Sequence, residues 1–262
     1  MAFFEMHFAS DTLGMQCTAH VVLPQVSTSQ IGMKSVGNAD GCPVVYLLHG
    51  LSDDHSIWIR RTSVERYASQ YGFALVIPCV HRSYYSNMQS GLRYWDFISD
   101  ELPKIVGSFF KVSQDPAKTF AAGLSMGGFG ALKLALNCPE KFAAAGAFSS
   151  AIRPARQTSV SPERKAEFES IFGNLDNIPG SIDDLYHMAE LRKKEGVNLP
   201  ELYLACGTED FLYQENLLFK AHLEKLGIPF TWCEEPGNHE WGFWDRHVLS
   251  FFRFAHKILV RQ

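Results

Sequence analysis

Residues 119–137 read TFAAGLSMGGFGALKLALN, two apolar runs that meet at Gly123-Leu124-Ser125-Met126-Gly127. The first run has the character of a buried strand, and the second has that of a helix with one polar edge. A serine between glycines at such a junction is typical of a nucleophile elbow, because strand and helix backbones crowd together there. The serine oxygen then lies at the positive end of the helix. An ordinary glycine-rich helix start is the alternative that the motif alone leaves open.

A nucleophile elbow requires an acid and then a histidine later in the chain. The strand-like run 201–206 ends at Glu209 and Asp210, and the run 230–234 leads into a loop that contains His239. Both loops follow the carboxyl ends of strands, where open α/β sheets place their chemistry. The order serine, acid, histidine therefore favours the elbow over a simple helix start.

Acyl transfer gives each of these residues a role. Ser125 is the predicted nucleophile, and His239 is the base, because imidazole titrates near neutral pH. Asp210 would orient the imidazole and stabilise its charged form. We prefer Asp210 to its rival Glu209 because Asp210 lies further beyond the strand and has the shorter side chain. A solvated turn is the alternative for either carboxylate.

The negative oxygen of a tetrahedral intermediate needs two fixed hydrogen-bond donors. One predicted donor is the backbone N–H of Met126, which follows the nucleophile. The other is the N–H of Leu51, because the strongly apolar run 44–48 stops at His49-Gly50 and the small glycine lets the next amide turn inward.

Aromatic residues beyond the strand ends are predicted to line the substrate site. Tyr84 and Tyr85 lie in the loop after the strand-like run 73–78, although one of them could instead pack beneath the loop. Trp241, two residues after His239, either forms a wall of the site or anchors the last helix.

Three segments carry a resemblance to a known family: LLHGL at 47–51, GLSMGGFGA at 123–131 and CGTEDFL at 206–212. They resemble the tributyrin esterase group, which belongs to the esterase D, S-formylglutathione hydrolase and antigen-85-like branch of the α/β-hydrolases. The similarity extends over nearly the whole chain, from about residue 4 to residue 254.

This resemblance implies a carboxylesterase of short acyl chains, with Ser125, Asp210 and His239 as the triad and Leu51 and Met126 as oxyanion donors. Members that act on glutathione thioesters tend to carry a cysteine shortly after the oxyanion turn and a histidine before the nucleophile. This chain has Ser52-Asp53-Asp54 and Leu124 at those places. The resemblance therefore favours other esters over S-formylglutathione.

The alternation of apolar runs predicts an α/β fold, a mostly parallel sheet of about eight strands flanked by helices. An antiparallel pair at 3–9 and 15–24 precedes core strands at 43–49, 73–78, 118–124, 142–149, 201–206 and 230–234. Helices are predicted at 58–71, 95–110, 126–137, 214–226 and 241–259. We interpret residues 1–262 as one domain, in which 151–199 form a small cap over the active-site face because they have too few apolar residues for a separate core.

Composition narrows the class of protein. The 262 residues are 46% hydrophobic, and 24 basic against 28 acidic side chains give a net charge of −4 without a basic run. Neither a nucleic acid nor a membrane is an expected partner. The six scattered cysteines form no C-x-x-C pair, and the first residues do not read as a signal peptide, so we expect a cytoplasmic protein. The oligomeric state is left open, with a homodimer or homotetramer among the alternatives.

No cofactor or metal is expected. His49, Asp53, Asp54 and His55 lack an established ligand spacing, and Phe243 stands where a zinc-protease helix starting at His239 needs its second histidine. The glycine-rich run 123–130 fits neither a dinucleotide nor a phosphate-binding motif.

The leading hypothesis is a serine carboxylesterase that acts on acetyl to butyryl esters, acylated sugars among them, through an acyl-enzyme. Its small cap should not bury a long acyl tail. S-formylglutathione hydrolysis, feruloyl or acetyl-xylan ester hydrolysis and acyl transfer to another alcohol are alternatives on the same fold. A non-catalytic binding protein is the alternative from a different class.

Overall fold

The computed structural model describes residues 1–262 apart from 28, 30, 32–35, 37–40, 154–161 and 262. Within these residues, eight strands form one sheet in the order β1-β2-β4-β3-β5-β6-β7-β8. The strands are β1 (Ala2–Ser10), β2 (Met15–Leu23), β3 (Val44–Leu48), β4 (Ala74–Pro78), β5 (Thr119–Leu124), β6 (Ala144–Phe148), β7 (Glu201–Gly207) and β8 (Phe230–Glu235).

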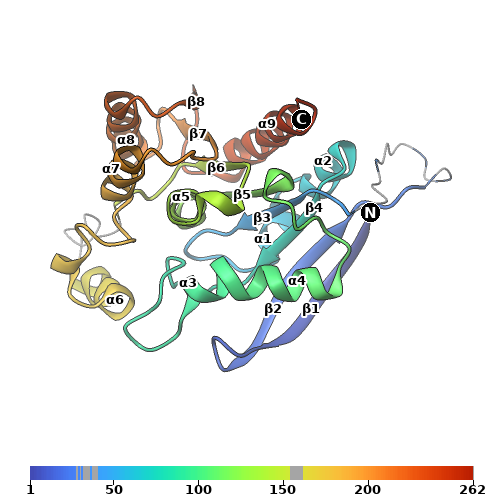
Figure 1. The fold of residues 1–262 in the computed structure, drawn as a ribbon, viewed down its shortest axis with the longest axis horizontal. Helices are drawn as coiled ribbons and strands as arrows, with labels where there is room; N and C mark the ends of the chain where they lie inside the picture. The colour runs from blue at the N-terminus through green and yellow to red at the C-terminus, as the bar shows by residue number, and fades with distance from the viewer. Residues whose placement is uncertain (28, 30, 32–35, 37–40, 154–161, 262) are drawn as a thin grey trace.

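The sheet is antiparallel only at one side. β1 pairs with β2 and β2 with β4 in antiparallel register, whereas all pairs from β4 to β8 are parallel. Figure 1 shows the β1–β2 hairpin and the β7–β8 pair at opposite sides of the molecule. The predicted mostly parallel sheet with an antiparallel pair at the start of the chain is confirmed.

Helices cover both faces of this sheet. They are α1 (Ile57–Arg61), α2 (Val64–Tyr71), α3 (Tyr94–Asp96), α4 (Leu102–Phe109), α5 (Met126–Asn137), α6 (Pro162–Phe172), α7 (Leu185–Glu195), α8 (Tyr213–Leu226) and α9 (Trp241–Leu259). None of the helices in the described part of the chain is long and apolar enough to cross a bilayer.

Two apolar cores follow from the alternation of side chains along each strand. Val44, Tyr46 and Leu48 of β3 belong to the core formed with α4, α5, α7 and α8, whereas Val45 and Leu47 belong to the core formed with α1, α2 and α9. Because both faces of β3 are covered, its sequence is a continuous apolar run, as parallel strands require.

One predicted helix is divided in two. The range 58–71 contains α1 and α2, separated at Thr62 and Ser63. The Ser63 N–H donates to the Asp245 carboxylate of α9 at 2.9 Å, and the Tyr67 hydroxyl donates to the same carboxylate at 2.9 Å. This contact with a distant helix fixes the break.

The segment 151–199 forms two helices that the sequence analysis did not predict, α6 and α7. Phe168 and Ile171 of α6 and Leu185 and Met188 of α7 are buried in the same core as α5. Residues 154–161 of the predicted cap lie outside the described residues. In the described part, the segment shares the main core and does not build one of its own.

Candidate active site

Ser125 lies at the sharp turn between β5 and α5. Its backbone has φ 53° and ψ −114°, a conformation that costs a non-glycine residue about 1–3 kcal/mol and persists only where neighbours enforce it. The Ser125 N–H donates to the Phe148 carbonyl at 2.8 Å. A Cβ at Gly123 would collide with the Gly127 carbonyl, and a Cβ at Gly127 would collide with the Leu48 carbonyl. A side chain would not fit at either position. The crowding between strand and helix therefore requires glycine at both, as the sequence motif predicts.

Asp210 and His239 are brought together from neighbouring loops. His239 Nδ1 lies 2.8 Å from Asp210 Oδ2, and the Asp210 side chain is fully buried. Asp210 Oδ1 accepts a second hydrogen bond from the Leu212 N–H at 2.8 Å. The carboxylate is thus held by two donors, and its bond to Nδ1 leaves Nε2 of His239 as the ring nitrogen available to a substrate or nucleophile.

The rival acid Glu209 forms hydrogen bonds with the loop after β8. Its carboxylate accepts hydrogen bonds from the Gly237 N–H and the Thr208 hydroxyl, and its own N–H donates to the Gly237 carbonyl at 3.1 Å. Glu209 is exposed and joins the β7 loop to the β8 loop. It supports the loop that carries His239, whereas the Asp210 carboxylate makes the hydrogen bond to the imidazole.

Aromatic rings fix the position of His239. The ring of Phe211 lies 4.6 Å from it at 50°, and the ring of Trp244 lies 4.8 Å from it at 86°. Trp244 is itself held by a hydrogen bond from its Nε1 to the Ser149 hydroxyl at 3.1 Å. The imidazole has 20% of its side chain exposed, so it is accessible to a reactant and still restrained.

The two predicted oxyanion donors come from the helix start after Ser125 and from the loop after β3. Met126 is the first residue of α5, so its N–H has no acceptor within the helix. Leu51 and Ser125 line the same cavity. The loop before Leu51 is anchored through His49, whose Nε2 accepts from the Val80 N–H at 3.1 Å and whose carbonyl accepts from the Tyr85 hydroxyl at 2.9 Å.

A cavity of about 470 Å³ opens over the elbow at the carboxyl ends of the strands. Ser125, His239, Tyr84 and Trp241 are among the side chains around it. Trp241 also packs edge-on against Trp58 at 5.3 Å, so it forms a wall of the cavity and anchors the start of α9 at once. Tyr84 is 2% exposed, and its ring packs against Phe129 and Phe168.

Tyr85 corrects one expectation. It is fully buried, does not line this cavity and points its hydroxyl at the His49 carbonyl. Both tyrosines have a positive φ of 52°, and this tight turn sends their side chains in different directions. Tyr85 therefore supports the oxyanion loop from below, and it is not a candidate for direct contact with substrate.

Arg82, Arg164 and Phe211 are among the lining residues that the sequence analysis did not select. Phe211 directly follows Asp210, so its position beyond the strand end could have identified it. The arginines carry no motif. Both pair with Glu167, Arg82 through Nε and Arg164 through Nη1, the latter at 3.0 Å. Arg164 is the only residue of the described cap segment in the lining, because α7 packs between α5 and α8 instead.

One carboxylate at the cavity has a perturbed titration. Burial raises the pKa of Asp53, and the backbone hydrogen bond to Gly50 only partly offsets this effect. Asp53 lies two residues after Leu51, so its charge is close to the predicted oxyanion donor.

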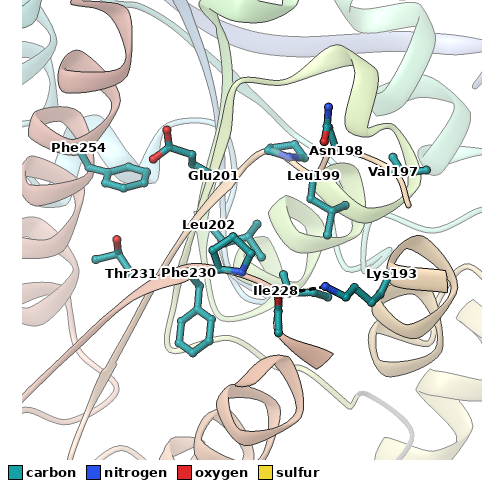
Figure 2. A pocket seen from close by; sticks show the side chains of 13 residues that line it. Lys193, Val197, Asn198, Leu199, Glu201, Leu202, Ile228, Phe230, Thr231 and Phe254 are labelled. Carbon is teal, nitrogen blue, oxygen red and sulfur yellow. Dashed lines mark hydrogen bonds between the residues drawn. The ribbon is translucent and has the colours of Figure 1, made fainter. Parts of the chain in front are cut away.

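Another hollow, of about 440 Å³, lies at the opposite end of the sheet (Figure 2). It is formed where β7 and β8 begin, between Glu201, Leu202 and Phe230, and Lys193 donates there to the Gly227 carbonyl at 3.3 Å. It contains no serine, cysteine or histidine. Ser125 and His239 line the cavity over the elbow instead.

Comparisons with known proteins agree with this geometry. A family model described as "Putative esterase" matches residues 10–250. An acetyl esterase of Caldicellulosiruptor saccharolyticus is 29% identical over 265 residues, 98% of this chain and 99% of that protein. Two Staphylococcus aureus structures cover 97% of this chain and 98% of their own: the fluorophosphonate-binding serine hydrolase F, with 32% identity and a TM-score of 0.87, and the S-formylglutathione hydrolase FrmB, with 31% identity and a TM-score of 0.85.

Proposed function

Since this chain belongs to the esterase family and is a serine carboxylesterase, we propose that it hydrolyses esters of short acyl chains, from acetyl to butyryl, with Ser125 as the nucleophile. The observation that carries the assignment is the 2.8 Å contact between His239 Nδ1 and Asp210, with His239 and Ser125 on one cavity.

In the proposed reaction, His239 Nε2 takes the proton of the Ser125 hydroxyl as its oxygen attacks the ester carbonyl. Asp210 holds the ring and stabilises the imidazolium that forms. The tetrahedral oxyanion accepts hydrogen bonds from the N–H groups of Leu51 and Met126. Collapse of the intermediate expels the alcohol, which takes the proton from His239, and leaves an acyl-enzyme. Water then attacks the acyl carbonyl while His239 takes its proton, and collapse of the second tetrahedral intermediate returns that proton to the Ser125 oxygen and releases the carboxylic acid.

The proposed preference for short acyl chains is supported by the shape of the cavity. Its volume of about 470 Å³ is small for a ligand site, and it must hold both parts of an ester. The rings of Phe168 and Phe172 pack behind Tyr84, so among the described residues this wall offers no channel for a long acyl chain. The curated relative named an acetyl esterase adds to this support.

A series of nitrophenyl esters from acetyl to dodecanoyl tests the preference. Each methylene buried in a channel contributes about 0.8 kcal/mol, which would raise kcat/KM about fourfold per carbon. We expect a maximum between acetyl and butyryl and a fall beyond it. A steady rise through octanoyl would refute the short-chain proposal. Fluorophosphonate labelling that survives in Ser125→Ala would refute the nucleophile.

S-formylglutathione is a second candidate substrate, favoured by the 31% identity to a structure described as a hydrolase of that thioester. Arg82 and Arg164 could approach its carboxylates, but Glu167 already pairs with both guanidinium groups. A comparison of kcat/KM for S-formylglutathione and nitrophenyl acetate decides between them. A higher value for the thioester would replace the proposed substrate class.

Two further proposals concern the setting of the reaction. A cytoplasmic location is supported by the six cysteines, all of which are free thiols.

A homo-oligomer is supported by the nine-residue edge strand β1, where Phe3 is 46% and Phe4 is 40% exposed. Light scattering coupled to gel filtration will give the mass of the particle in solution. A mass equal to that of one chain would refute the homo-oligomer.

A further inference from the structure

Two histidines and a glutamate meet beside the sheet, away from Ser125. Glu5 of β1 lies directly opposite His20 of β2 in the antiparallel register. His55, from the loop that joins Leu51 to α1, covers the pair, and its ring is 4.5 Å from the His20 ring at 87°. One ligand atom from each of the three residues lies within 4.8 Å of the other two.

Both imidazoles contain a buried nitrogen that lacks a partner. Nδ1 of His20 and Nδ1 of His55 are shielded from solvent and make no hydrogen bond, and the whole of His20 is only 7% exposed. Buried polar atoms in folded proteins are nearly always paired, so two such atoms in one cluster require an explanation. A cation held between the two lone pairs would satisfy both.

The residues that the sequence analysis weighed as metal ligands are occupied otherwise. Nδ1 of His49 contacts the Gly50 carbonyl at 2.7 Å, and its Nε2 accepts from Val80. The Asp54 carboxylate accepts from the N–H and hydroxyl of Ser56 at 2.8 and 2.6 Å. Of those residues only His55 keeps a free nitrogen, and its partners come from the β1–β2 hairpin, far away in sequence.

The charges around the cluster suit a cation. Burial lowers the pKa of His20 and of His55, and the nearby carboxylates of Glu5 and Asp54 act in the opposite direction. Those carboxylates give the cluster the negative charge that a divalent cation needs.

We propose that Glu5, His20 and His55 bind one divalent transition-metal ion, zinc by preference, with water as the fourth ligand. Two imidazoles and a carboxylate are a common zinc ligand set that leaves one position open. Tetrahedral bonds of 2.0–2.1 Å place ligand atoms about 3.3 Å apart. The three ligand atoms now lie within 4.8 Å of one another, so binding requires small shifts of the side chains toward the ion. Glu5, whose side chain is 56% exposed, would exchange its pairing with His7 at 3.4 Å for the ion.

The bound ion would add a link between two parts of the fold that meet at the His20–His55 ring contact. It would tie the β1–β2 hairpin to the loop 51–56, whose first residue is the proposed oxyanion donor. Glu5, His20 and His55 are not among the residues that line the cavity at Ser125, so the ion stabilises the loop and does not supply the chemistry of ester cleavage.

Calorimetric titration of the tag-free, chelator-treated protein with zinc chloride tests the site. We expect one zinc per chain with a dissociation constant in the micromolar range or below, and a higher melting temperature. His20→Ala and His55→Ala should weaken binding about 100-fold or more, since loss of outer-shell partners alone typically costs 10–100-fold. His187→Ala, on α7, is the matched control and should bind as the wild type does.

Cobalt(II) provides a second readout. The wild type should give the intense visible bands of four-coordinate cobalt, and His55→Ala should not. If His20→Ala does not fold, Glu5→Gln and His55→Ala decide the question, because neither side chain is fully buried. Absence of zinc binding by the wild type, or unchanged binding in His55→Ala, would overturn the proposal. Either result leaves the esterase assignment intact, because that assignment is tested at Ser125.

Discussion

Acidification should destabilise this protein through His49, the buried histidine behind the oxyanion loop. Its Nε2 accepts a hydrogen bond from the Val80 N–H, and its Nδ1 lies 2.7 Å from the Gly50 carbonyl. These partners require the neutral tautomer with hydrogen on Nδ1. A second proton on Nε2 would face the Val80 N–H and would place a charge in the core, so burial lowers the pKa of His49 to about 4.

The sign and size of the effect follow from linkage. In the unfolded chain the pKa of a histidine is about 6.5, so between pH 6.5 and 4 the unfolded state binds a proton that the folded state does not. The free energy of unfolding therefore falls as pH falls through this window. The contribution of His49 at pH 4.5, relative to pH 7.5, is a loss of about 2.5 kcal/mol. Above about pH 7.5 this group contributes almost no pH dependence.

Urea unfolding of wild type and His49→Gln at pH 7.5, 6.0 and 4.5, in the presence of a chelator, measures this contribution. Glutamine does not titrate, and its amide oxygen can still accept from Val80. We expect the variant to be less stable at pH 7.5 but to lose about 2–3 kcal/mol less than wild type on acidification. His187→Gln should keep the wild-type dependence. Equal losses in wild type and His49→Gln would refute the reasoning.

The central strands could be predicted because a strand that is buried on both faces has a continuous apolar sequence. β3 and β4 were predicted at 43–49 and 73–78 and are found at Val44–Leu48 and Ala74–Pro78. The division of α1 from α2 could not be predicted in this way. It depends on hydrogen bonds to Asp245, which lies 182 residues after Ser63.

The helices of the segment 151–199 were not predicted, although the sequence of α7 contains a capping residue at each end. The Asp184 side chain accepts from the N–H groups of Tyr186 and His187, and Gly196 ends α7 with a φ of 68°. An aspartate before a helix and a glycine after it are known capping signals. Because α7 has few buried residues, the amphipathic pattern between the two caps is weak, and the caps alone did not lead to a predicted helix.

At the site, acyl-transfer chemistry limits the residue types, and the strand–turn–helix elbow sets the order serine, acid, histidine, so the sequence alone nominates Ser125, Asp210 and His239. The residues that line the cavity could not be predicted from residue type and chain order. Arg82 comes from the loop after β4 and Arg164 from α6, and both pair with Glu167. Which side chain of a tight turn faces the cavity depends on backbone angles that composition does not encode.

The identity of the acid and the role of a buried lysine yield the remaining predictions. Asp210→Asn should lower kcat about 10³-fold or more because the amide offers His239 the wrong partner, whereas Glu209→Gln should stay within a few-fold of wild type. A reversed pattern in ester assays would exchange the two acids. Lys133 of α5 is fully buried and donates to the Tyr85 carbonyl at 3.1 Å, to Ser86 at 2.9 Å and to Asp183. Lys133→Met removes this tie between α5, the tyrosine loop and the cap segment, and it leaves the Asp183 charge without its partner. We expect a loss of about 2–3 kcal/mol in urea unfolding, less than for a fully buried pair because the Asp183 side chain is 19% exposed. Removal of that charge as well, by Asp183→Asn, should recover part of the loss; a Lys133→Met protein as stable as wild type would show that the buried ammonium contributes no net stability to the contact between cap and core.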